Sequence, residues 1–217
     1  MINRLKLLML TCLIFLSSQS IGQTNDSIEI VKTFDLYKKA TQTRNGAEVY
    51  RLLDKNTIEW YSFILEKIKY ADSIEVSNLS LNDKMTVLSA RLMISKDSIL
   101  QFDGKTFCIY VTNNAILGNS SDLSLKLQTV FVSGDKAKAP VVATPEGDII
   151  EFEFNQENGS WKFNLNSVFK AEDLLLKKYL SGENLRENDY ALYILEAVSD
   201  KKSTNVLWNP LFPKPGK

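Results

Sequence analysis

The chain has 217 residues, with 26 Lys and Arg, 26 Asp and Glu and no histidine, so its formal net charge is zero at pH 7. A neutral chain without a Lys- or Arg-rich tract lacks the electrostatic footprint of a nucleic-acid-binding protein. The absence of histidine excludes Ser-His-Asp and Cys-His catalysis and removes the commonest metal ligand. The sequence also contains neither a GxGxxG nor a P-loop pattern, so we predict no metal and no cofactor.

The first 22 residues, MINRLKLLMLTCLIFLSSQSIG, have the pattern of a secretory signal peptide. Arg4 and Lys6 precede an apolar run over residues 7–16, which is shorter than the ~20 residues that span a bilayer. We therefore expect cleavage after Gly22, export to the periplasm or the extracellular space, and no membrane span. A lipoprotein in which Cys12 carries the lipid is the alternative.

Residues 23–217 have the length of a single domain with one core. Their N-terminal half shows helical periodicity, as where Ile30, Phe34 and Tyr37 recur on one face. Asn45 and Asn56 each begin a capping signal, with an acidic residue three positions later. We expect helices over residues 27–40, 46–53, 57–68, 82–93, 95–102 and, despite its β-branched residues, 105–117.

Alternation with period two begins at Leu123 and predicts a half-buried strand that runs to Phe131. Turn sequences then separate three further strands, over residues 137–143, 150–154 and 161–165. Pro140 lacks an amide donor and therefore indicates an edge or a bulge. The alternation places Phe and Trp on one face and charged residues on the other. It predicts a curved antiparallel meander whose apolar face is covered by the preceding helices.

Two more helices are expected over residues 168–180 and 186–198, the first of them ended by Gly182. The inner face of the second is predicted to carry Tyr190, Tyr193, Ile194 and Ala197. The tail contains four large apolar residues that we expect to pack back onto the domain: Leu207, Trp208, Leu211 and Phe212. The predicted fold class is α+β, with N-terminal helices packed on a curved antiparallel β-meander and extra C-terminal helices.

Three segments of the meander, residues 134–139, 152–154 and 159–163, resemble the closing strands of the nuclear transport factor 2-like superfamily, also called the cystatin-like cone fold. The resemblance extends over about residues 28–165 and implies helices lying across the concave face of the sheet. Ketosteroid isomerase-like members use a carboxylate buried in the cone, and many relatives dimerise. The helical segment 82–117 is longer than the family usually inserts, and the C-terminal helices lie beyond its usual end.

The charged residues and the lone mature cysteine favour structural roles. Glu151 and Glu153 share one strand face, but that face points away from the apolar residues, so a solvated surface is favoured over an acid–base pair. Cys108 is the only cysteine beyond residue 22, so no disulfide can form within the mature chain. It lies in TFCIYV and is expected to be a small buried hydrophobe rather than a nucleophile. Lys126 and Arg91 could enter a pocket, but a surface position is favoured for both.

Six aromatic residues are expected to converge between the helices and the sheet: Tyr61, Tyr110, Phe131, Phe152, Phe154 and Trp161. Core packing is their first interpretation, and an apolar ligand pocket with Tyr hydroxyls as polar handles is the alternative. The main functional hypothesis is a non-enzymatic exported domain that binds a small apolar ligand or a protein partner. The alternatives are an isomerase- or hydratase-type enzyme with a buried carboxylate, and a cell-envelope protein that forms homodimers through the sheet.

Overall fold

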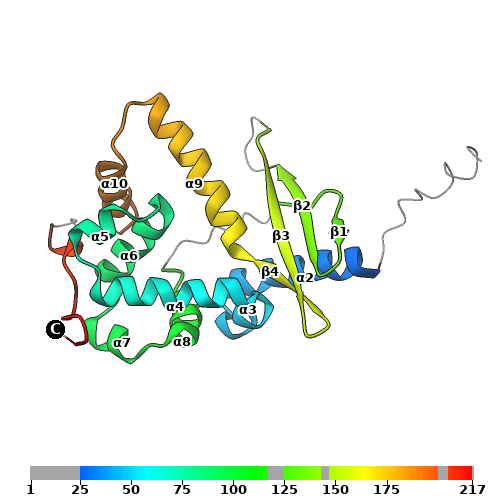
Figure 1. The fold of residues 1–217 in the computed structure, drawn as a ribbon, viewed down its shortest axis with the longest axis horizontal. Helices are drawn as coiled ribbons and strands as arrows, with labels where there is room; N and C mark the ends of the chain where they lie inside the picture. Colours follow the sequence, from blue (N-terminus) through cyan, green and yellow to red (C-terminus); the bar gives the residue numbers. More distant parts are fainter. Residues whose placement is uncertain (1–24, 117–124, 143–146, 200–204, 217) are drawn as a thin grey trace, which may run out of the picture.

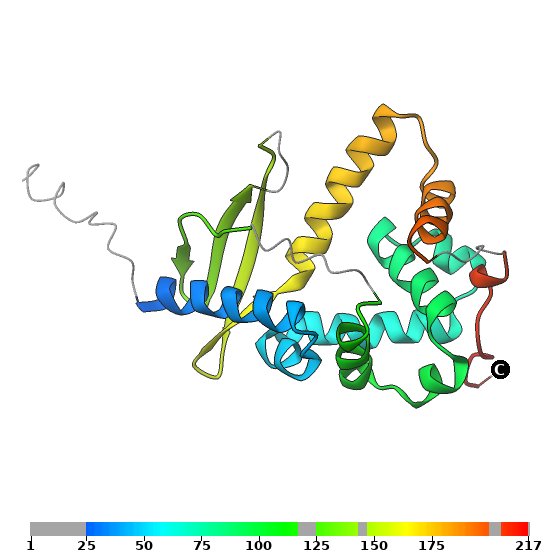
Figure 2. The same cartoon turned by 180° about the vertical axis from the view of Figure 1, so that it is seen from behind.

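The computed structural model describes residues 25–116, 125–142, 147–199 and 205–216. Its helices and its four-stranded antiparallel sheet confirm the predicted α+β class. The sheet lies at one end of an elongated molecule and most of the helices gather at the other, as Figure 1 and Figure 2 show from opposite sides. The predicted signal peptide lies outside the described residues. Among the residues that are described, no helix is long and apolar enough to cross a membrane.

The helices of the N-terminal half are α2 (Asn25–Gln42), α3 (Gly46–Leu52), α4 (Lys55–Tyr70), α5 (Ser73–Ser77), α6 (Leu81–Met93), α7 (Lys96–Gln101) and α8 (Gly104–Asn113). The predicted cap at Asn45 is confirmed, because its side-chain oxygen accepts the Glu48 N–H at 3.1 Å. The predicted cap at Asn56 is wrong. Asp54 caps α4 two residues earlier, since its buried carboxylate is also bonded to the sheet. Cys108 is buried within α8, as expected.

The sheet is a meander in the order β1 (Phe131–Ser133), β2 (Lys136–Val142), β3 (Ile149–Glu157) and β4 (Ser160–Asn164). Asn158 and Gly159 have positive φ angles of 50° and 73°, which suit the tight turn between β3 and β4. The register places Ala137 opposite Phe154 and Ala139 opposite Phe152. Small residues in β2 therefore lie beside the large rings of β3 on the inner face.

Helix α2 covers this inner face. The centroid of its Phe34 ring lies 5.5 Å from that of Phe152 and 5.6 Å from that of Phe163, both in edge-to-face contact. The cover is narrower than expected, because α4 packs mainly on α6 and α8 rather than on the sheet. Strands ~4.8 Å apart make a four-stranded sheet only slightly wider than one helix of ~10–12 Å diameter. One helix therefore suffices, and the others form a second apolar layer of their own.

The strand predicted from Leu123 is shorter in the structure, where the ladder begins only at Phe131. The chain bends at Thr129, so the buried positions change from odd to even numbers and Phe131 turns outward, 61 % exposed. Pro140 contributes to this break. Its carbonyl accepts the Gln128 N–H at 2.9 Å, and the amide hydrogen that proline lacks would point to the same neighbouring segment. Of the two positions predicted for Pro140, the edge is the one found: this residue lies beyond the β1–β2 ladder and pairs regularly with Glu151 of β3.

Helix α9 (Leu165–Gly182) begins directly after β4 and packs along β3. The helix ends at Gly182, as predicted, but this glycine is its last helical residue and does not form the cap. Asn184 instead adopts the left-handed conformation, with φ at 54°, and the Leu185 N–H returns to the Leu180 carbonyl at 3.0 Å. This pairing is the 6→1 hydrogen bond of a Schellman motif, with Asn in the place that Gly more often takes.

Helix α10 (Glu187–Ser199) packs on α6 with a different face from the one predicted. Ala191 and Leu195 are buried, whereas Tyr193 is 67 % exposed. The small side chain of Ala191 permits the close approach to α6, which a face of tyrosines would prevent. The expectation for the tail holds better, since its four large apolar residues are partly buried against the core.

A buried carboxylate joins the sheet to the helical layer. Asp54 Oδ1 accepts hydrogen bonds from the Thr57 N–H at 2.9 Å and from Thr57 Oγ1 at 2.5 Å. Its Oδ2 accepts one from Asn155 Nδ2 of β3 at 2.7 Å, and its own N–H donates to the Phe163 carbonyl of β4. Thr57 Oγ1 in turn accepts the N–H of Leu165, the first residue of α9, at 3.0 Å. We call this set of contacts the Asp54 junction.

We expect Asp54→Ala to lower the free energy of unfolding by about 3 kcal/mol, because it removes a helix cap and leaves buried donors of β3 and α4 unpaired. Asp72→Ala is the matched control, since Asp72 caps α5 through a similar capping bond at an exposed site. Its loss should be about 1 kcal/mol. Urea denaturation of both variants measures the difference, and equal losses would contradict a structural role for the junction.

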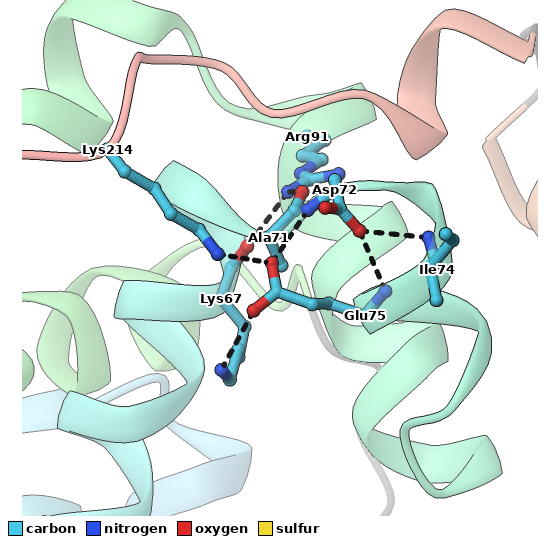
Figure 3. A network of polar contacts seen from close by, with 7 residues as sticks. All are labelled: Lys67, Ala71, Asp72, Ile74, Glu75, Arg91 and Lys214. Carbon is cyan, nitrogen blue, oxygen red and sulfur yellow. Dashed lines mark hydrogen bonds and ion pairs between the residues drawn. The ribbon is translucent and has the colours of Figure 1, made fainter. Parts of the chain in front are cut away.

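Arg91 is buried, contrary to the surface position predicted for it. Its guanidinium donates to the carbonyls of Lys67, Ile68 and Ala71 at the C-terminal end of α4, and to that of Leu207 in the tail, at 2.7–3.0 Å. The negative end of the helix dipole favours a cation here. Burial lowers the pKa of Arg91 to about 10, so it stays charged at neutral pH. Figure 3 shows Arg91 between α4 and the tail, with Lys214 bonded to Glu75 nearby.

We predict that Arg91→Met will destabilise the fold by about 3 kcal/mol and release the tail, because several carbonyls lose their donor at once. Hydrogen exchange should show faster exchange at Leu211 and Phe212, whose N–H groups bond to the Lys69 carbonyl. Lys214→Met, which removes only the exposed ion pair with Glu75, is the control and should leave tail exchange unchanged. An Arg91→Met variant with a fully protected tail would show that Arg91 does not anchor it.

Candidate ligand-binding cavity

A cavity of about 100 Å³ lies between α2, α4, α6, α8 and α9. Its walls combine rings from α4 and α9 with polar side chains from α2, α6 and α9. The residues that matter for its chemistry are Tyr37, Trp60, Tyr61, Asn82, Phe169 and Glu172. The volume is well below the ~300–1,000 Å³ of a pocket for drug-sized ligands, so this space suits a molecule of a few non-hydrogen atoms.

Trp60 fixes the aromatic part of the wall. Its ring centroid lies 4.5 Å from that of Phe169 and 4.9 Å from that of Tyr61. Its indole Nε1 donates a hydrogen bond to Asp83 Oδ1 at 2.8 Å, which holds the ring in one orientation. Burial raises the pKa of Asp83, although the hydrogen bonds from Trp60 and Ser80 oppose that effect. The α4–α9 contact is therefore a rigid aromatic surface.

Glu172 of α9 is the carboxylate of the cavity. Its Oε2 accepts one long hydrogen bond, from Asn82 Nδ2 at 3.4 Å. Burial, and secondly the negative charge of Asp173, raise the pKa of Glu172 to about 7. Among the residues that the structure describes, neither Lys nor Arg lines the cavity. At neutral pH this carboxyl is therefore poised between its acid and its anion, with no lining cation to neutralise the anion.

Two tyrosines complete the polar part of the wall. Burial raises the pKa of Tyr37 and that of Tyr61 well above the usual value, so both hydroxyls keep their protons. Behind Tyr61, burial raises the pKa of the Cys108 thiol to about 12, although a hydrogen bond with Tyr61 opposes it. Cys108 is thus protonated and not nucleophilic at neutral pH, in line with its predicted structural role.

The structure separates the six aromatic residues that were expected to converge. Tyr61 lines the cavity. The other five lie elsewhere: Phe152, Phe154 and Trp161 are buried between α2 and the sheet, Tyr110 contacts Phe102 at 4.9 Å, and Phe131 is exposed on the outer face. Phe131 therefore does not join the others, because the bend at Thr129 reverses its side. The sheet residues fill the core under α2, while the cavity lies beyond it, between helices.

The outer face of the sheet carries the two acidic residues singled out by the sequence. Glu151 and Glu153 are 56 % and 40 % exposed, and both lie beside Lys138, at 3.0 and 3.7 Å. This confirms the solvated surface that was favoured for them. Among the described residues, no group of three acidic, Cys or His side chains could hold a metal ion. Pairing of two copies through this face stays a prediction, which size-exclusion chromatography at several concentrations would test.

The sequence reasoning missed Glu172, although a signal for it exists. Leu165, Phe169, Leu176 and Leu180 recur at helical spacing on α9, and Glu172 falls within the same stripe. A single carboxylate inside an apolar stripe indicates either a salt bridge or a site. Comparison with known proteins adds no assignment: no family model, curated protein or solved structure matches this chain. The resemblance to the nuclear transport factor 2-like superfamily therefore stays a prediction.

Replacing Glu172 by Gln should change the pH dependence of stability. In the unfolded chain Glu172 loses its proton near its ordinary pKa of 4.5. In the folded protein it keeps that proton until the pH exceeds about 7. Stability that this proton contributes is complete below pH 4.5 and is lost through that window as the pH rises. Between pH 4.5 and about 7 the free energy of unfolding of Glu172→Gln should therefore rise by about 3 kcal/mol relative to that of the parent.

Urea denaturation at a series of pH values measures this gain. Glu29→Gln, on the exposed face of α2, is the matched control for the same chemical change. If the stability difference between Glu172→Gln and the parent does not vary with pH, the carboxyl is not buried as the structure places it.

Proposed function

We propose that this chain is an exported, non-enzymatic binding domain that holds a small molecule in the cavity between α4, α6 and α9. The observation that supports it is the placement of Glu172 beside Trp60 and Phe169, in a space that no described Lys or Arg lines. Purely structural carboxylates are usually well bonded, as Asp54 is in its junction. Glu172 has instead one long hydrogen bond and a strongly raised pKa. Such groups in a concave site are candidates for ligand contacts.

The walls favour a ligand with two kinds of surface. Trp60, Tyr61 and Phe169 offer apolar contact, while Glu172 and the Tyr37 side chain offer polar contact. The expected ligand is therefore small and amphipathic, which makes the apolar ligand predicted from the sequence more specific. Its contacts would come from several sides, since the lining residues belong to α2, α4, α6, α8 and α9.

An isomerase- or hydratase-type enzyme is the second candidate, and one observation favours it. A carboxyl with a pKa near 7 is suited to general acid–base catalysis, and Tyr37 and Tyr61 could stabilise an oxyanion. Binding alone requires fewer assumptions, because it needs only the contacts that the cavity already offers. The two differ in what Glu172→Gln does: an enzyme would still bind its substrate but leave it unconverted.

Native mass spectrometry of protein purified from its own host tests the proposal. We expect a small retained ligand that is lost in Val111→Phe, which fills the cavity from α8. Phe152→Leu is the control, because it perturbs the core under α2 without touching the cavity, and should retain the ligand. If no ligand is retained, and a concentrated host extract fails to raise the melting temperature of the parent above that of Val111→Phe, the proposal is wrong.

A further inference from the structure

We propose that the ligand of this cavity is a small organic ammonium ion, with its charge on Glu172 and its alkyl groups against Trp60, Tyr61 and Phe169. This inference rests on the proposed function and specifies the class of ligand. It follows from three features of the cavity: the charges around Glu172, the chemistry of the opposite wall, and the available volume.

The charged side chains that the structure describes around Glu172 are negative. Asp173 follows it on α9, and Asp83 faces the same region from α6. Each of these two has a strong donor of its own, because Asp173 accepts the Asn82 N–H at 2.8 Å and Asp83 accepts the Trp60 indole N–H. From α2 and α4 the facing titratable groups are Tyr37 and Tyr61, both neutral. The first turn of α6, which contains Asn82, favours the anionic form of these carboxylates. Glu172, with a single long hydrogen bond among the described residues, is thus the acceptor left for a cation.

The opposite wall suits the rest of such an ion. Trp60, Tyr61 and Phe169 present ring surface, and aromatic faces attract ammonium groups through their quadrupoles, most strongly for Trp. The contact gains strength where the rings are withdrawn from water, and Trp60 and Phe169 are both partly buried. A carboxylate together with aromatic rings therefore recognises both the charge and the alkyl shell of one small cation.

The same features argue against other ligand classes. A neutral apolar molecule would keep the Glu172 carboxyl protonated and offer no acceptor for its O–H, so it would use only the aromatic part of the wall. A bare metal ion would need more oxygen ligands than this site offers, since no described group of three acidic side chains meets there. The volume of about 100 Å³ limits the ion to a few non-hydrogen atoms.

Titration calorimetry with three probes tests the inference. The probes are tert-butylammonium, which has a charge and N–H donors; tetramethylammonium, which has the charge alone; and tert-butanol, which has nearly the shape of the first without the charge. We expect both cations to bind about tenfold or more tightly than tert-butanol. Glu172→Gln should weaken both cations about tenfold, while Glu151→Gln on the outer face should leave them unchanged.

The pH dependence gives an independent readout. Tetramethylammonium does not titrate, so its affinity should fall as the pH drops below about 7 and Glu172 takes up a proton. Binding at pH 7 should release up to about half a proton, measurable in buffers of different ionisation enthalpy. Glu172→Gln should abolish both effects.

The outcomes separate this inference from the proposed function. Equal binding of tert-butanol and tert-butylammonium, blocked by Val111→Phe, would overturn the ammonium assignment and leave the cavity as a binding site. No binding of any probe, or equal affinity of the cations for the parent and Glu172→Gln, would also overturn it. The proposed function would then be tested separately, by whether native mass spectrometry finds a ligand retained from the host.

Discussion

The buried carboxylate of Asp54 is the constraint on which the arrangement of the molecule depends. Its oxygens accept hydrogen bonds from Thr57 of α4 and Asn155 of β3, and its N–H reaches Phe163 of β4. Thr57 extends the connection to Leu165, where α9 begins. The sheet, α4 and α9 therefore start from one shared point, and buried polar networks of this kind specify a single geometry when every member is bonded. The space between α4 and α9 depends on the angle at which these helices leave the Asp54 junction.

That divergence produces the cavity. Trp60 lies one turn into α4 and Phe169 one turn into α9, where their rings still touch. One turn further along α9, Glu172 has no such neighbour and faces the cavity instead. A half-buried carboxyl with a raised pKa lowers the stability of the protein as it ionises near neutral pH, and a bound cation would offset that cost. The same geometry thus accounts for a local weakness of the fold and for its proposed use.

The sequence predicted those elements that local patterns specify. The spacing of Phe34 and its neighbours located α2, and alternation located the strands of the meander, because both periods follow from backbone geometry. The errors arose where contacts distant in the chain decide. Asp54 displaced the expected cap because Asn155 bonds to it, and the bend beside Pro140 turned Phe131 outward. The apolar stripe of α9 contained Glu172 as a signal, but only the neighbours from α2, α4 and α6 show that it faces a cavity.

The most direct test of the account is the pKa of Glu172, measured by carbon-detected NMR titration of the labelled side-chain carboxyl. Glu172→Gln assigns the signal. The account predicts a pKa of about 7 in the free protein, and a fall on addition of tert-butylammonium, because a bound cation favours the carboxylate. A value close to 4.5 that does not respond to the cation would contradict the account, since it would place Glu172 in water rather than in the cavity.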